Sequence, residues 1–136
     1  MTAYFVDTWF FIAYLRDSDP HHRTVTRLAR TLREASFVTH DGVLSELLAF
    51  FSGHGDLWRK HVAAFVRDVL VSEQFTVASL TRHLFEEALT LYERRLDKEY
   101  SLVDCASMRL MIRRGITTVL TNDHHFVQEG FAILNA

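Results

Sequence analysis

The stretch that decides the fold is Ala3-Tyr4-Phe5-Val6-Asp7-Thr8. Its apolar part, residues 3–6, is typical of a buried β-strand, and it stops abruptly at Asp7. A helical pattern follows at once over residues 8–15. This order predicts a carboxylate at the carboxyl end of an inner strand, facing the amino end of a helix. Ligands bind at that edge in open α/β sheets, so the positions of the other carboxylates decide what the edge can bind.

Short apolar runs alternate with longer helical patterns along the rest of the chain, which predicts a parallel α/β sheet. Strands are expected at residues 3–7, 36–40, 75–78, 116–120 and 131–134. Helices are expected at residues 8–15, 21–34, 42–52, 57–70, 82–96, 102–114 and 124–129. Asp41, Asp56 and Ser101 are placed to cap the helices that follow them. Right-handed crossovers between parallel strands would leave the strand ends on one edge.

Composition predicts one globular domain over residues 1–136, because domains typically contain roughly 100–200 residues and hydrophobic residues make up 49% of the chain. The single cysteine, Cys105, cannot form an internal disulfide, which favours a cytoplasmic location. We expect no signal peptide and no membrane span, since no apolar run approaches ~18 residues. The 15 Lys and Arg against 17 Asp and Glu argue mildly against a nucleic-acid partner unless the acids are clustered.

Four acids stand out by their positions. Asp7 ends the first strand, and Asp123 follows the fourth. Glu46 lies in the helix after the second strand, at the edge of its apolar stripe, with no Lys or Arg three or four residues away. Asp104 lies in the first turn of the helix before the fourth strand. If the first and fourth strands are neighbours, all four acids can share one edge.

Each acid also has a purely structural interpretation. Asp7 can cap the helix that starts at residue 8, and Asp104 has the capping-box spacing from Ser101. Asp123 can be a turn residue, and Glu46 can be a solvated helix residue. The sequence alone leaves these alternatives open for each acid taken singly.

Convergence of the four acids would have a clear chemical consequence. Their mutual repulsion would raise their pKa values unless a cation were present. Oxygen ligands with few nitrogens or sulfurs select Mg²⁺ or Mn²⁺. Such clusters suit metal-assisted phosphoryl transfer.

Four segments, in order, together resemble a known family. They are Tyr4-Phe5-Val6-Asp7-Thr8, Leu44-Ser45-Glu46-Leu47, Tyr100-Ser101-Leu102-Val103-Asp104-Cys105-Ala106-Ser107 and Leu120-Thr121-Asn122-Asp123-His124-His125-Phe126. They closely resemble the PIN domain, and best its VapC-like toxin branch. The resemblance spans nearly the whole chain.

The resemblance implies a Rossmann-like three-layer α/β/α sandwich, with a mostly parallel sheet of about four to five strands, and a Mg²⁺- or Mn²⁺-dependent endoribonuclease. Asp7, Glu46, Asp104 and Asp123 match the metal-binding acids. Thr121, and less closely Thr8, match hydroxyl positions that support the acids or the metal-bound water. Thr121 is therefore counted with the catalytic residues, and Thr8 is also a candidate substrate contact. The implied reaction is attack of metal-activated water on an RNA phosphodiester, leaving a 5′-phosphate and a 3′-hydroxyl.

Other residues carry weaker hypotheses. Arg23, Arg27 and Arg30 form a stripe that can hold RNA phosphates, although a plain solvated face explains it as well. His124 and His125 follow Asp123 and invite a general-base role, but we interpret them as surface residues at the start of a helix.

The chain has an apolar surplus that suggests partners. We expect a homodimer interface or a groove for a VapB-like antitoxin, although core packing is the default explanation for most of these residues. The surplus consists of Phe10, Phe11, Leu47, Leu48, Phe50, Phe51 and Trp58.

Three other functions compete with a toxin. The first is a housekeeping PIN nuclease in RNA processing, and the second is a non-catalytic RNA- or protein-binding module. The third is a phosphatase or receiver domain that uses an Asp at the end of the first strand. A phosphatase usually needs a second acid two residues on, where this chain has Trp9.

Overall fold

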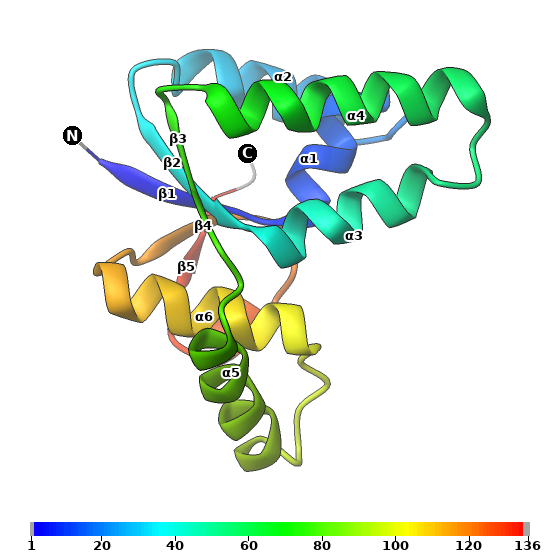
Figure 1. Cartoon of the computed structure of the whole chain (residues 1–136). Helices are drawn as coiled ribbons and strands as arrows, with labels where there is room; N and C mark the ends of the chain where they lie inside the picture. The colour runs from blue at the N-terminus through cyan, green and yellow to red at the C-terminus, as the bar shows by residue number, and fades with distance from the viewer. Residues whose placement is uncertain (1, 135–136) are drawn as a thin grey trace.

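The structure is a computed structural model that describes residues 2–134. Its elements are β1 (Ala3–Val6), α1 (Thr8–Leu15), α2 (His22–Thr31), β2 (Ser36–His40), α3 (Asp41–Phe51), α4 (Asp56–Val71), β3 (Phe75–Ala78), α5 (Arg82–Arg94), α6 (Leu102–Arg114), β4 (Thr118–Leu120), α7 (His125–Gln128) and β5 (Ala132–Ile133). Helices α1 to α4 lie on one side of the sheet, and α5 and α6 lie on the other (Figure 1). The predicted three-layer α/β fold is confirmed.

The sheet has the strand order β3-β2-β1-β4-β5, and its paired strands are parallel. The order reverses beside β1, since β2 lies on one side of it and β4 on the other. Val6 at the end of β1 pairs with Leu120 at the end of β4. Asp7 and Thr121 therefore emerge side by side at the switch point, where open α/β sheets bind ligands.

The ends of several helices differ from those predicted. Helix α2 stops at Thr31 rather than residue 34. The predicted Asp41 cap of α3 is wrong: His40 caps this helix, because its Nδ1 accepts from the Gly42 N–H at 3.0 Å. The Asp41 carboxylate instead accepts from the Leu80 N–H at 3.3 Å. Likewise, Asp56 is the first residue of α4 and not its cap.

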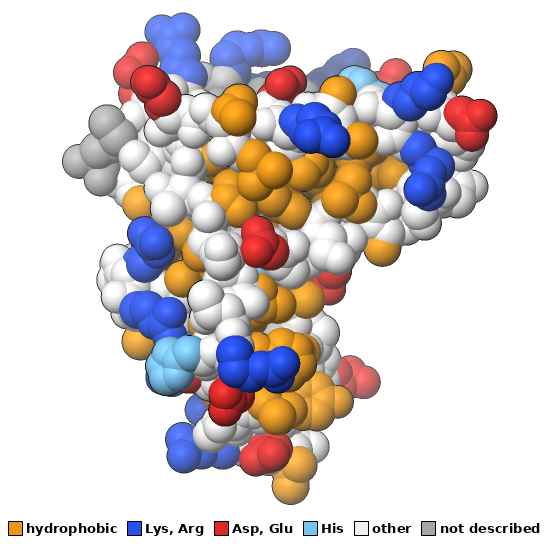
Figure 2. Space-filling model, in the orientation of Figure 1, with side chains coloured by type: hydrophobic (Ala, Val, Ile, Leu, Met, Phe, Trp, Pro, Cys, Tyr) orange, Lys and Arg blue, Asp and Glu red, His pale blue; other side chains and the backbone are white. Residues whose placement is uncertain are grey.

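The apolar surplus divides between core and surface. Phe10, Phe11, Leu47 and Phe51 are buried, and core packing accounts for them. Leu48 and Phe50 remain 39% and 38% exposed. In Figure 2, hydrophobic side chains also gather on the surface below α4.

Of the helices in residues 2–134, none is both long and apolar enough to cross a bilayer.

Candidate metal centre

Asp7 is held at the end of β1 by its neighbour in the sheet. Its Oδ2 accepts a hydrogen bond from the Thr121 hydroxyl at 2.8 Å, and its side chain makes no capping bond to α1. Helix capping is therefore not what this carboxylate does. Burial, together with repulsion from Asp104 and Glu46, outweighs the Thr121 bond and raises the pKa of Asp7 to about 7.

Glu46 lies in the second turn of α3 and leans toward the start of α1. The Thr8 hydroxyl donates to its Oε1 at 2.6 Å, so the acid is not a freely solvated helix residue. Partial burial raises its pKa, and the Asp104 charge adds to the rise while the Thr8 bond opposes it. Thr8 thus supports Glu46 in the way that Thr121 supports Asp7.

Asp104 caps its own helix and also lies among the other acids. It forms a capping box with Ser101, whose hydroxyl accepts from the Asp104 N–H at 3.0 Å while Asp104 Oδ2 accepts from the Ser101 N–H at 3.1 Å. It also faces the other acids. Burial raises its pKa, and the Asp123 charge adds to that rise.

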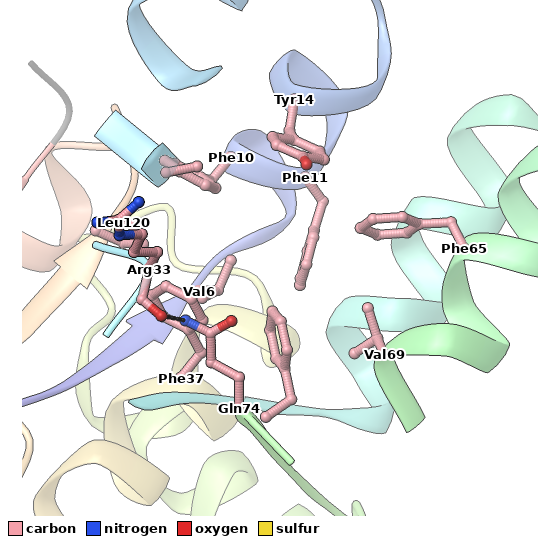
Figure 3. A pocket seen from close by; sticks show the side chains of 12 residues that line it. Val6, Phe10, Phe11, Tyr14, Arg33, Phe37, Phe65, Val69, Gln74 and Leu120 are labelled. Carbon is pink, nitrogen blue, oxygen red and sulfur yellow. Dashed lines mark hydrogen bonds between the residues drawn. The ribbon is translucent and has the colours of Figure 1, made fainter. Parts of the chain in front are cut away.

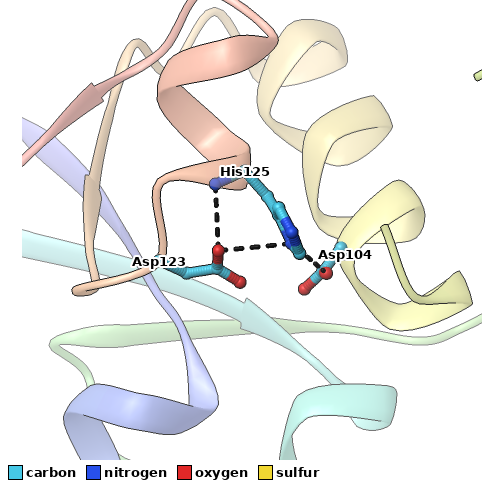
Figure 4. A group of neighbouring side chains, drawn as sticks. All are labelled: Asp104, Asp123 and His125. Carbon is cyan, nitrogen blue, oxygen red and sulfur yellow. Dashed lines mark hydrogen bonds and ion pairs between the residues drawn. The ribbon is translucent and has the colours of Figure 1, made fainter. Parts of the chain in front are cut away.

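Asp123 and His125 complete the edge from the loop after β4. Asp123 Oδ1 accepts from the His125 N–H at 2.9 Å, and the Asp123 N–H donates to Thr121 Oγ1 at 3.1 Å. The His125 ring turns back between two acids: its Nδ1 lies 3.2 Å from Asp123 Oδ1 and 3.5 Å from Asp104 Oδ2 (Figure 4). His125 is therefore not a plain surface residue, whereas His124 is exposed.

The four acids form one electrostatic unit. Asp104 raises the pKa of Asp7 and of Glu46, and Asp123 raises that of Asp104, in each case after burial as the larger cause. Within residues 2–134, no Lys or Arg forms an ion pair with any of the four. A cluster of partly buried carboxylates without a cationic side chain is costly unless a cation from outside joins it.

The donor set fits a divalent cation. Asp104, Asp123 and His125 each offer one ligand atom, and the three atoms lie within 4.8 Å of one another. Ligands at ~2.1 Å from an octahedral ion lie about 3 Å apart, close to the spacings of His125 Nδ1 from the two acids. That buried nitrogen makes no hydrogen bond, and the groups nearest to it are the two carboxylate oxygens that would share a cation with it.

Sequence reasoning missed His125 as a member of the cluster. The signal was its spacing, because a residue two positions after Asp123 can fold back over it in a tight turn.

The predicted arginine stripe lies away from the four acids. Arg23, Arg27 and Arg30 are exposed on α2, and among the described residues none of them pairs with the four acids. Their role stays a prediction.

Comparison with known proteins places the chain among nucleases. A family profile described as the PIN domain matches residues 4–131. The sequence is 33% identical over 130 residues to the 23S rRNA-specific endonuclease VapC20 of Mycobacterium tuberculosis, covering 93% of this chain and 94% of that protein. The crystal structure of Mycobacterium tuberculosis VapC20, described as a sarcin-ricin loop cleaving toxin, superposes with a TM-score of 0.86 over 99% of this chain and 100% of that one, at 26% identity.

A second solved structure shares the fold alone. FitAcB from Neisseria gonorrhoeae superposes with a TM-score of 0.67 over 96% of each chain, at 16% identity.

Proposed function

The chain belongs to the PIN domain family, and from this membership we propose that it is a Mg²⁺- or Mn²⁺-dependent endoribonuclease, the toxin of a toxin–antitoxin pair. The observation that carries the proposal is the meeting of Asp7, Glu46, Asp104 and Asp123 at the switch point of the sheet. The acids raise one another's pKa values, and the described residues supply no Lys or Arg to neutralise them. A divalent cation would relieve that repulsion.

Within this proposal each residue has a separate task. Asp104, Asp123 and His125 would hold the ion, with Asp7 and Glu46 completing the anionic surround. When bound, the ion supplies a Lewis acid that activates water and neutralises charge on the phosphodiester. Thr121 fixes the Asp7 carboxylate, and Thr8 fixes that of Glu46. We therefore propose that Thr8 orients an acid and does not contact the substrate.

The substrate we propose is a structured loop of ribosomal RNA. The support is the similarity to VapC20, which is named as a 23S rRNA-specific endonuclease. The test is to incubate the purified protein and Mn²⁺ with a stem–loop copied from the sarcin-ricin region, and with the same stem carrying a scrambled loop. We expect one cut in the native loop, with a 5′-phosphate and a 3′-hydroxyl at the new ends. Equal cutting of both loops would contradict the substrate assignment, and no cutting of any RNA would contradict the nuclease.

We propose a small antitoxin as the protein partner. Its docking place would be the apolar cavity of about 200 Å³ between α1, α4 and the sheet (Figure 3). Phe11, Phe65 and Phe75 line it, and Arg33 and Gln74 add polar groups. Such a cavity suits apolar side chains of an amphipathic helix. If a short open reading frame lies beside the gene, co-expression of its product with this chain should yield a complex with no RNA cleavage, and Phe65→Asp should restore cleavage.

A homodimer remains a prediction, supported by the exposed Leu48 and Phe50. Light scattering should give twice the chain mass. It should fall to a single chain mass in a Leu48→Glu/Phe50→Glu variant.

A further inference from the structure

One buried hydrogen bond joins the end of β2, which leads directly into the helix of Glu46, to the helix that carries Asp104. His40, the last residue of β2, has its Nε2 2.9 Å from Ser107 Oγ in α6. Both residues are 0% exposed. Helix α3 begins directly after His40 and presents Glu46 in its second turn. Ser107 lies one turn after Asp104 in α6. The bond therefore links the residue before α3 to the part of α6 that carries Asp104.

The hydrogen bonds fix the protonation state of this imidazole. The Gly42 N–H can only donate, so His40 Nδ1 must accept and cannot carry a proton. The ring proton therefore sits on Nε2 and is donated to Ser107. The Ser107 hydroxyl in turn donates to the Val103 carbonyl at 2.9 Å, next to Asp104 in the chain. Burial lowers the pKa of His40 to about 4, so the ring is neutral near pH 7.

Close packing seats the ring firmly against α3. A Cβ added at Gly42 would lie 2.7 Å from His40 Cε1, so a side chain there would displace the ring. The other side of the ring faces β1, with the Phe5 ring centroid 5.9 Å away. The network thus runs without a break from the first turn of α3 to the first turn of α6.

This connection opposes a force that the site itself generates. Helix α3 presents Glu46 and α6 presents Asp104, and the Asp104 charge adds to the burial that raises the pKa of Glu46, so the two like charges repel each other. Without a tie, that repulsion would favour a wider spacing whenever no cation is bound. If the spacing is already fixed, cation binding does not have to move the helices together, so less of the binding free energy is lost.

We propose that His40 is a positioning residue, which acts through Ser107 to fix the spacing of the two helices that present Glu46 and Asp104 to the proposed cation site. This inference rests on the proposed metal-dependent function and deepens it. Partners that orient metal ligands typically contribute roughly 10- to 100-fold to metal affinity. His40 itself does not touch the cation.

Two substitutions separate the two hydrogen bonds of the ring. In His40→Asn, the amide oxygen takes the place of Nδ1, which keeps the bond to Gly42 and removes the one to Ser107. In His40→Gln, the amide nitrogen takes the place of Nε2, which keeps the tie to Ser107. Mn²⁺ affinity of the metal-free protein is measured by titration calorimetry, and its Tm is measured alongside. We expect His40→Asn and Ser107→Ala to weaken Mn²⁺ binding roughly tenfold or more and His40→Gln to weaken it by less than about threefold.

The same titration in a Glu46→Gln background shows whether the His40–Ser107 hydrogen bond acts by opposing the repulsion between Glu46 and Asp104. There, His40→Asn should change Mn²⁺ affinity by less than about twofold, because the repulsion it opposes is gone. An equal loss in both backgrounds, or unchanged affinity in His40→Asn alone, would overturn the positioning role while leaving the nuclease proposal intact. Absence of Mn²⁺ binding by the wild type would overturn both.

Discussion

Asp7 has an environment that is costly to the metal-free protein when its carboxyl group is ionised. Its pKa rises from 3.8 to about 7 on folding, chiefly because it is buried. The folded state therefore holds a proton that the unfolded state has lost between about pH 4 and pH 7. Stability falls with pH across that window and levels off above it. Since one pKa unit corresponds to roughly 1.4 kcal/mol, ionised Asp7 destabilises the metal-free fold by a few kcal/mol.

Asp7→Asn should remove the loss of folding stability that ionised Asp7 causes above about pH 4. Urea unfolding in EDTA at pH 5 and pH 8 should show the wild type losing more stability between the two pH values than the variant. Near pH 8 the variant should be the more stable protein by about 2 kcal/mol or more. Adding Mn²⁺ should stabilise the wild type at pH 8 and leave Asp7→Asn little changed. Parallel pH profiles for the two proteins would contradict the assigned environment of Asp7.

Gly42 offers a second prediction at the residue scale. An alanine inside a helix ordinarily stabilises it by roughly 1 kcal/mol relative to glycine. Here the added Cβ would lie 2.7 Å from the His40 ring, which is fully buried. We therefore expect Gly42→Ala to lower the Tm, with Gly53→Ala as the control, because nothing lies within 4 Å of a Cβ at Gly53. A raised Tm in Gly42→Ala would mean that the ring is not fixed there.

The sequence is a good guide to the acids and a poor guide to what surrounds them. Asp7 and Asp123 can be placed because apolar runs end beside them, and strand ends share an edge whatever the loops do. For His125 the only signal is its spacing from Asp123, because its position depends on a turn in the backbone that brings its ring back over that residue. Periodicity carries no signal for that.

At the scale of elements, α6 combines a structural and a chemical task in its first turn. Its boundaries, Leu102–Arg114, agree with the sequence prediction, and a left-handed Gly115 ends the helix. Those signals are local, so they can be read from the chain. The predicted cap of α3 is wrong because His40 is selected by its buried partner Ser107, which is 67 residues away. Interactions of that range cannot be read from one helix alone.

The two tasks of α6 can be separated by substitution. Ser101→Ala removes the hydroxyl that accepts from the Asp104 N–H, so we expect a loss of roughly 1 kcal/mol of stability. RNA cleavage should fall by only a few-fold, since the Asp104 carboxylate keeps its bond to the Ser101 N–H. Asp104→Asn should lower cleavage by roughly 100-fold or more. A Ser101→Ala variant as inactive as Asp104→Asn would contradict this separation.

At the scale of the whole molecule, the strand order brings the acids together from four separate parts of the chain. The β1–β4 pairing sets Asp7 beside Thr121, and α3 and α6 reach the same edge from opposite faces of the sheet (Figure 1). Alternating strands and helices predict the layers. The neighbour relation of β1 and β4 follows only from the family resemblance, because the apolar runs do not say which strands pair.

The arginine stripe on α2 is also tested at this scale. If Arg23, Arg27 and Arg30 hold RNA phosphates, the triple change to Gln should raise KM and weaken the dependence of RNA binding on salt. The slope of log affinity against log salt concentration should fall by about one for each phosphate that is no longer bound, while kcat should stay near that of the wild type. Arg67→Gln, at an exposed position on α4, is the matched control. An unchanged KM in the triple variant would assign the stripe to a solvated face.

The most direct test of the central claim is RNA cleavage by the wild type, Asp7→Asn and Asp104→Asn, each in Mn²⁺ and in EDTA. We predict that only the wild type in Mn²⁺ cuts the RNA, and that the cut leaves a 5′-phosphate and a 3′-hydroxyl. Both variants should remain folded by circular dichroism. Cleavage that persists in EDTA, or in both folded variants, would contradict a metal-dependent mechanism built on these acids.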